Sequence, residues 1–91
     1  MPDTPEPPAP PTPGLMAEYE ARAEAAYARL YDVTTPSHAL KDLKDDASQY
    51  LTRAIQVADA LNLPAEATRL RARRDNILAV WNSQFRGSTN R

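Results

Sequence analysis

Residues 36–63 read PSHALKDLKDDASQYLTRAIQVADALNL, and their apolar side chains recur in steps of three and four. This is the spacing of side chains on one side of an α-helix, so we predict a helix over residues 36–62. At about 100° per residue the apolar side covers a wide arc, more than one neighbouring helix would fill. The sequence therefore predicts a central helix that packs between two others through Leu40, Leu43, Ala47, Tyr50, Ala54, Val57 and Leu61.

Both ends of this helix carry boundary signals. Thr35 stands before Pro36, so its hydroxyl is placed to cap the helix, and proline suits the first helical position. At the other end Asn62 is suited to the left-handed backbone region, and Pro64 to opening a further helix over residues 64–85. A connection this short predicts an antiparallel pair of helices.

The sequence before residue 36 divides into a helix and a tail. Apolar residues again fall on one side over residues 15–32, which predicts another helix. Residues 2–14 contain seven prolines, and we expect residues 1–14 to be a disordered tail with no part in the core. We therefore predict an all-α fold: a small antiparallel three-helix bundle, up-down-up, over residues 15–87, with a disordered Pro-rich N-terminal tail and a polar C-terminal end at residues 88–91.

The proline tail has two interpretations. Its PxxP spacings fit the ligands that dock aromatic grooves as polyproline II helices. Such ligands usually carry a basic residue beside the prolines, whereas the nearest charges in this chain are Asp3 and Glu6. We favour the interpretation that the tail is a linker.

The composition offers little catalytic chemistry. The sequence has no cysteine, one histidine, and no motif with catalytic or metal-ligand spacing. We therefore predict a non-enzymatic protein with no cofactor and no metal site. No stretch has the length and apolarity of a membrane span, and the N-terminus lacks the pattern of a signal peptide, so the expected location is the cytoplasm.

The last predicted helix carries the residues that we expect to bind a partner. Arg74 falls within its apolar stripe, where it would extend to the edge, pair with Glu20 or Glu24, or contact another molecule. Trp81 belongs to a cluster of large apolar residues that either packs against the first helix or stays partly open. Tryptophan and arginine are the types most enriched at interface hot spots. We predict a protein partner of unknown identity, or a second copy of this chain, that contacts Arg74, Ile77, Leu78, Trp81 and Phe85.

Nucleic-acid binding is the alternative. Residues 1–63 contain ten acidic and five basic residues, whereas residues 64–91 contain two acidic and six basic ones. The arginines of this basic end could each neutralise a phosphate of a nucleic acid. However, Arg69 and Arg73 share one flank of the helix while Arg71 points to the other, so the four arginines do not form one ridge. Neutralisation of the basic end by neighbouring helices is the favoured interpretation of Arg69, Arg71, Arg73 and Arg74.

Overall fold

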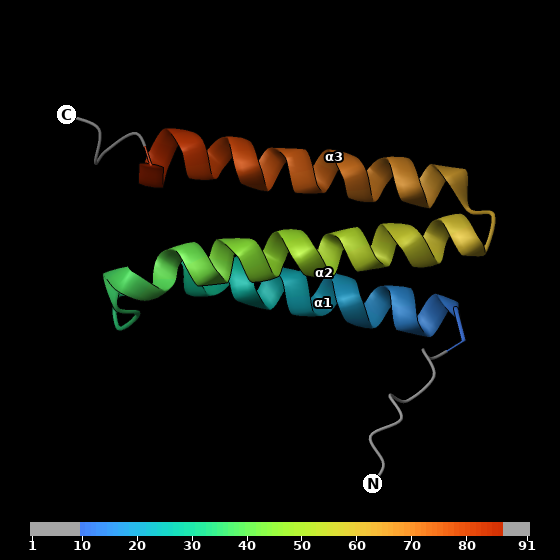
Figure 1. Ribbon diagram of the computed structural model, residues 1–91, viewed down its shortest axis with the longest axis horizontal. Coiled ribbons are helices and arrows are strands. Elements are labelled where there is room, and N and C mark those ends of the chain that lie inside the picture. Colours follow the sequence, from blue (N-terminus) through green and yellow to red (C-terminus); the bar gives the residue numbers. More distant parts are fainter. Residues whose placement is uncertain (1–9, 87–91) are drawn as a thin grey trace, which may run out of the picture.

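The computed structural model describes residues 10–86, and for Phe85 and Arg86 it describes the backbone alone. This part of the chain forms three α-helices: α1 (Pro13–Arg29), α2 (Leu40–Ala60) and α3 (Pro64–Val80). The helices run up, down and up, with α2 between α1 and α3 (Figure 1). The predicted all-α antiparallel three-helix bundle is therefore confirmed.

The first helix begins earlier than predicted. The Thr12 hydroxyl accepts a hydrogen bond from the Leu15 amide at 3.0 Å, and Pro13 occupies the first helical turn. This is an ordinary N-terminal cap followed by proline, a pattern that the surrounding prolines obscure in the sequence. Pro13 and Gly14 therefore belong to α1 and not to the predicted tail. Residues 1–9 of that tail, and residues 88–91 of the predicted polar end, lie outside the described residues.

The connection between α1 and α2 differs from the prediction at both ends. The first helix ends at Arg29 instead of Asp32, and the hydroxyl of Thr35 donates to the Arg29 carbonyl at 2.8 Å. Thr35 thus satisfies a carbonyl at the end of α1. The prediction that it caps the next helix is wrong. A short 3₁₀ turn, η1 (Ser37–Ala39), precedes α2, which begins at Leu40 and not at Pro36.

The turn between α2 and α3 follows the prediction. Asn62 has a φ of 59°, in the left-handed region. The amides of Asn62 and Leu63 donate to the carbonyls of Asp59 and Ala58 at 3.1 and 2.9 Å, so the end of α2 is closed by a Schellman motif. Pro64 opens α3 as predicted.

The central helix is covered on both sides by its own chain. Its residues Leu51, Ala54 and Ala58 have no exposed surface, and Ala23 of α1 and Leu70 of α3 are equally buried. This arrangement confirms that the wide apolar arc of α2 is shared by two neighbours. The remaining core side chains are Met16, Ala26, Leu30, Leu43, Ala47, Ile55, Val57, Ala67 and Ile77.

The last helix continues past Val80 with a wider turn. Residues Trp81–Arg86 form the π-helical segment η2, so the helical backbone reaches one residue beyond the predicted end at Phe85. None of the helices within residues 10–86 has the length and apolarity needed to cross a membrane.

Candidate functional site

Arg69 is the first of the four α3 arginines, and it joins α3 to α1. Its Nη1 and Nη2 atoms donate to the two carboxylate oxygens of Glu20 at 2.7 and 3.0 Å, and Nη2 also lies 2.7 Å from Glu66 Oε1. The hydrogen bond from Arg69 lowers the pKa of Glu20 although partial burial opposes that change. Arg69 is therefore shared between two carboxylates of its own chain.

Arg73 makes the same kind of contact one turn further along. Its Nε and Nη2 atoms each lie 2.7 Å from a carboxylate oxygen of Glu24, and its guanidinium lies 5.0 Å from the centre of the Tyr27 ring. The hydrogen bond with Glu24 raises the pKa of Arg73. A guanidinium can form both hydrogen bonds to one carboxylate while it lies near an aromatic ring, whereas an ammonium group cannot form the same pair of bonds.

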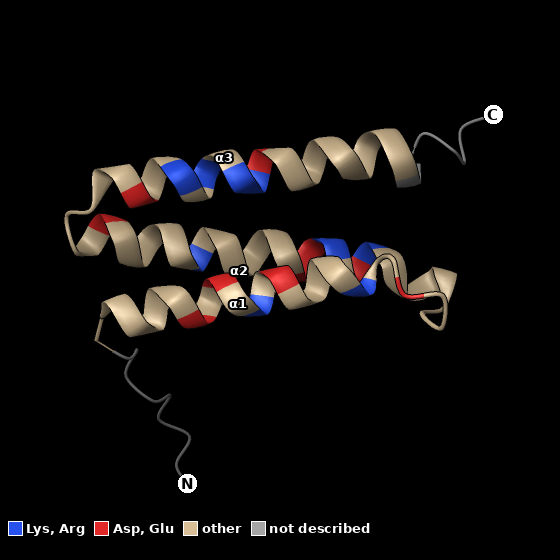
Figure 2. Ribbon diagram, turned by 180° about the vertical axis from the view of Figure 1, so that it is seen from behind, with Lys and Arg blue, Asp and Glu red and all other residues tan. Residues whose placement is uncertain are grey.

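Arg71 points away from α1 and pairs with α2. Its Nη2 atom lies 3.1 Å from Asp59 Oδ2. The basic bands of α3 and the acidic bands of α1 are visible in Figure 2. Three of the four arginines are thus neutralised by carboxylates of the neighbouring helices, as the favoured interpretation of the charge asymmetry expects. Nucleic-acid binding remains a prediction that these contacts do not favour.

Arg74 differs from the other three arginines. Its Nη1 atom donates to the Thr52 hydroxyl at 3.1 Å, and that hydroxyl donates in turn to the Ser48 carbonyl at 2.9 Å. Of the three alternatives for Arg74, the pairing with Glu20 or Glu24 is wrong, because those carboxylates are occupied by Arg69 and Arg73. Among residues 10–86, no carboxylate forms an ion pair with Arg74.

The predicted apolar contacts divide between core and surface. Ile77 has no exposed surface and is part of the core, so its assignment to a partner-binding surface is wrong. Leu78 follows it on α3, about 100° further round the helix, and is only partly buried. The side chain of Phe85 lies outside the described residues.

Trp81 is partly buried and packs against the core at the start of η2. The Nζ atom of Lys44, from α2, lies 5.6 Å from the centre of the indole ring. Lys44 also forms an ion pair with Asp45 at 2.8 Å and keeps 19% of its side chain exposed. Trp81 therefore has a cation of α2 on its face, a neighbour that the sequence analysis did not identify.

These residues form one candidate site along the contact between the last two helices. We name it the α2–α3 strip: Lys44 on α2, Arg74 and Leu78 on α3, and Trp81 at the start of η2. Arg74, Leu78 and Trp81 are spaced by four and three residues, so they follow one side of the helix. The strip combines two cations with two large apolar groups, which suits binding to a surface with a carboxylate beside an apolar group.

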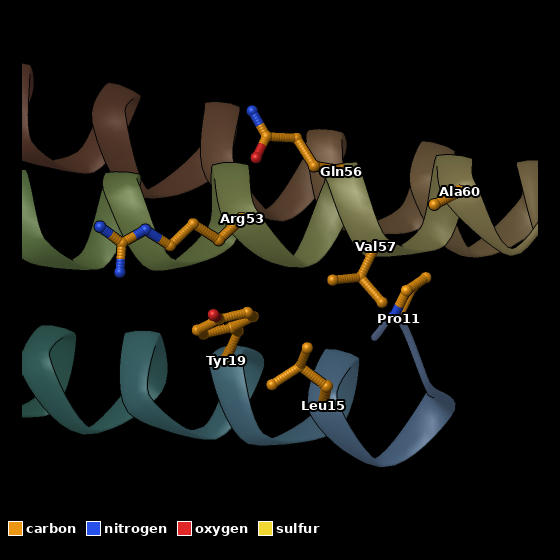
Figure 3. Close-up of a pocket in the computed structure, with 7 residues that line it drawn as sticks. All are labelled: Pro11, Leu15, Tyr19, Arg53, Gln56, Val57 and Ala60. Atoms are coloured by element: carbon orange, nitrogen blue, oxygen red, sulfur yellow. The ribbon is translucent and has the colours of Figure 1, made fainter. Parts of the chain in front are cut away.

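A concave site lies between the first two helices, and the sequence analysis did not identify it. We name it the α1–α2 groove; it has a volume of about 410 Å³ and is shown in Figure 3. Tyr19 of the groove stacks on Tyr50 with ring centres 6.2 Å apart, and the guanidinium of Arg53 lies 5.9 Å from the Tyr50 ring. The residues that line it are Pro11, Leu15, Tyr19, Arg53, Gln56, Val57 and Ala60.

The described side chains form no cluster of three or more histidines or carboxylates that could hold a metal ion.

No protein-family model matches this chain, and no curated protein or solved structure shows significant similarity to it.

Proposed function

We propose that this protein is a non-enzymatic protein-binding module, a small regulator, adaptor or inhibitor, and that its partner contacts the α2–α3 strip. The observation that carries the proposal is the position of Arg74. The other three arginines of α3 are paired with carboxylates, whereas Arg74, one helical turn before Leu78, donates to the neutral hydroxyl of Thr52. A partner carboxylate would give this guanidinium a stronger, charge-assisted hydrogen bond.

The neighbouring groups support the same surface. Trp81 and Leu78 keep part of their apolar area accessible, and large apolar groups beside arginine are characteristic of interface hot spots. Lys44 adds a second cation at the tryptophan end of the strip. We therefore propose a partner that presents at least one carboxylate next to apolar side chains. A second copy of this chain is the alternative occupant.

The test is affinity capture from the native cells with three forms of the full chain: wild type, Arg74→Met and Arg71→Met. Arg71→Met is the matched control, because it removes an arginine of the same helix that is already paired with Asp59. We expect proteins identified by mass spectrometry to be retained by the wild type and by the control and lost from Arg74→Met. Circular dichroism of each form establishes that helicity persists. An identical set of retained proteins in all three forms would contradict the proposal.

Two further measurements separate the alternatives. Sedimentation of the purified wild type and of Arg74→Met identifies a second copy as the partner if a dimer forms and the substitution dissociates it. Nucleic acid assayed in the same eluate supports the alternative only if its binding falls steeply with salt and on neutralisation of Arg69 and Arg73.

The proposed place of action is the cytoplasm. Its support is the absence of cysteine from the sequence, which fits a reducing compartment. Fractionation of the native cells with detection of the full chain tests this part of the proposal.

A further inference from the structure

The α1–α2 groove is occupied at one end by the chain itself. Pro11 precedes the cap of α1 and lies across from Val57, where it forms the end of the groove (Figure 3). From Pro11 the groove continues past Leu15 and Tyr19 toward Arg53. The chain that leads into Pro11 therefore reaches the fold at one end of the groove.

The sequence before Pro11 has a period that matches an extended proline helix. Prolines stand at positions 2, 5, 8 and 11, each three residues from the next. A polyproline II helix has three residues per turn, so these four prolines share one edge. Since Pro11 lines the groove, Pro8, Pro5 and Pro2 would share its edge if the segment before it were a polyproline II helix.

The charges of the segment and of the groove are complementary. Asp3 and Glu6 are also three residues apart and share a second edge of the same helix. On the groove side, Arg53 is exposed and forms no ion pair within residues 10–86; its guanidinium lies over the Tyr50 ring. Arg22 lies 6.0 Å from the centre of the same ring but is paired with Glu18, so Arg53 is the cation of the two that lacks a carboxylate partner among residues 10–86.

The lengths also agree. At about 3.1 Å per residue, Pro8 would lie about 9 Å and Glu6 about 15 Å along the helix from Pro11. On α2, Arg53 lies four residues before Val57 and seven before Ala60, which is about 6 to 10 Å along the helix axis. A continuation of the proline helix from Pro11 therefore brings the Glu6 carboxylate within reach of the long Arg53 side chain.

We propose that residues 6–8 bind in the α1–α2 groove of the same chain as part of a polyproline II helix, with Pro8 against its apolar wall and Glu6 at Arg53. The chain then supplies its own proline-rich ligand. Because the linker is short, the ligand has a high effective concentration at the groove, and an outside proline-rich segment must compete with it. This contact is separate from the α2–α3 strip and does not depend on the proposed function.

The test uses the full chain and a single spin label. The sequence has no cysteine, so Thr4→Cys provides one labelling position in the tail. We expect the nuclear magnetic resonance signals of the Gln56, Val57 and Ala60 amides to broaden strongly, and those of the exposed α3 residues Asp75 and Ala79 to broaden much less. Equal broadening at both sets of residues would overturn the proposal.

Two pairs of variants in the labelled chain test the register and the charge. Pro5→Ala with Pro8→Ala should remove most of the broadening at the groove, whereas Pro7→Ala with Pro10→Ala should preserve it, because both pairs weaken the proline helix equally but only the first shares the edge of Pro11. Arg53→Glu should reduce the broadening, and Glu6→Arg added to it should restore the broadening. Equal loss in the two proline pairs, or no response to charge reversal, would overturn the proposal.

The occupant is identified by mixing two samples. Isotope-labelled chain without a spin label is combined with spin-labelled chain that carries no isotope. We expect no broadening at Gln56 or Val57 in the mixture. Broadening there as strong as in the chain that carries both the isotope and the spin label would show that the tail of a second copy fills the groove. That result would overturn binding within one chain.

Discussion

Glu24 of α1 and Arg73 of α3 face each other with both carboxylate oxygens 2.7 Å from guanidinium nitrogens. They lie 49 positions apart, and so do Glu20 and Arg69. The equal offset means that α1 and α3 run parallel and in fixed register, and the Tyr31 hydroxyl extends this contact to Gln84 at 3.1 Å. Two bidentate ion pairs therefore join α1 to α3 in this register.

The Glu24–Arg73 pair should contribute measurably to stability. We expect a double-mutant cycle with Glu24→Gln and Arg73→Met to give a coupling energy of about 0.5–1 kcal/mol, near the upper end for partly exposed pairs, because the contact has two hydrogen bonds. Urea unfolding followed by circular dichroism provides the four stabilities. Arg73→Lys should lose most of the coupling, since an ammonium group cannot form both bonds. A lysine variant as stable as the wild type would contradict this explanation.

The Glu20–Arg69 contact should make stability depend on acid. The pKa of Glu20 is lower in the folded chain than its ordinary value of 4.5, chiefly because Arg69 donates to its carboxylate. Its contribution is therefore fully present above about pH 4.5 and lost as the pH falls through the lower folded pKa. We expect Glu20→Gln to lower the free energy of unfolding at pH 7 by up to about 1 kcal/mol, and the difference to vanish near pH 2. Unfolding curves at several pH values measure this.

Glu18→Gln is the control for that experiment. Glu18 pairs with Arg22 within α1, and both side chains are 53% exposed. Its loss should change stability less than the loss of Glu20, because exposed pairs within one helix contribute about 0.3–0.5 kcal/mol. A larger effect for Glu18→Gln than for Glu20→Gln would contradict the assigned role of the contact between α1 and α3.

Asn62 should be replaceable by glycine and not by a branched residue. Its φ of 59° places it in a backbone region that costs most residues about 1–2 kcal/mol, and asparagine and glycine least. We expect Asn62→Gly to preserve or raise the melting temperature and Asn62→Val to lower it, as measured by thermal unfolding. Similar destabilisation by both substitutions would indicate that the asparagine side chain, and not the backbone, matters at this turn.

The sequence alone was enough to predict the helices that apolar spacing encodes, but the end signals at Thr35 and Pro36 gave the wrong start for α2, which begins at Leu40. Periodic apolar residues gave the three helices, and Asn62 with Pro64 gave the turn between α2 and α3. The partners of the four arginines could not be obtained in the same way. They depend on how α1 is rotated and shifted against α3. The sequence around Arg74 does not indicate that Arg69 and Arg73, and not Arg74, pair with Glu20 and Glu24.

The α1–α2 groove and the start of α1 were missed for a related reason. Thr12 and Pro13 are an ordinary cap and first residue, but they stand at the end of a proline-rich segment whose composition suggested a tail throughout. Pro11 contributes to the groove because the chain folds back beside α2, a contact between residues more than 40 positions apart. Periodicity within one helix carries no information about it.

Ile77 and Leu78 are adjacent in the sequence but should respond differently to truncation. Ile77 has no exposed surface and contacts the core, so Ile77→Ala should lower the free energy of unfolding by about 2–5 kcal/mol through lost burial and the cavity it leaves. Leu78 is partly buried at the α2–α3 strip, so Leu78→Ala should cost less than half as much while it weakens capture of the partner. Urea unfolding gives the first quantity and affinity capture the second. Equal destabilisation by the two substitutions would mean that Leu78 is core, and the α2–α3 strip would then lose its central apolar contact.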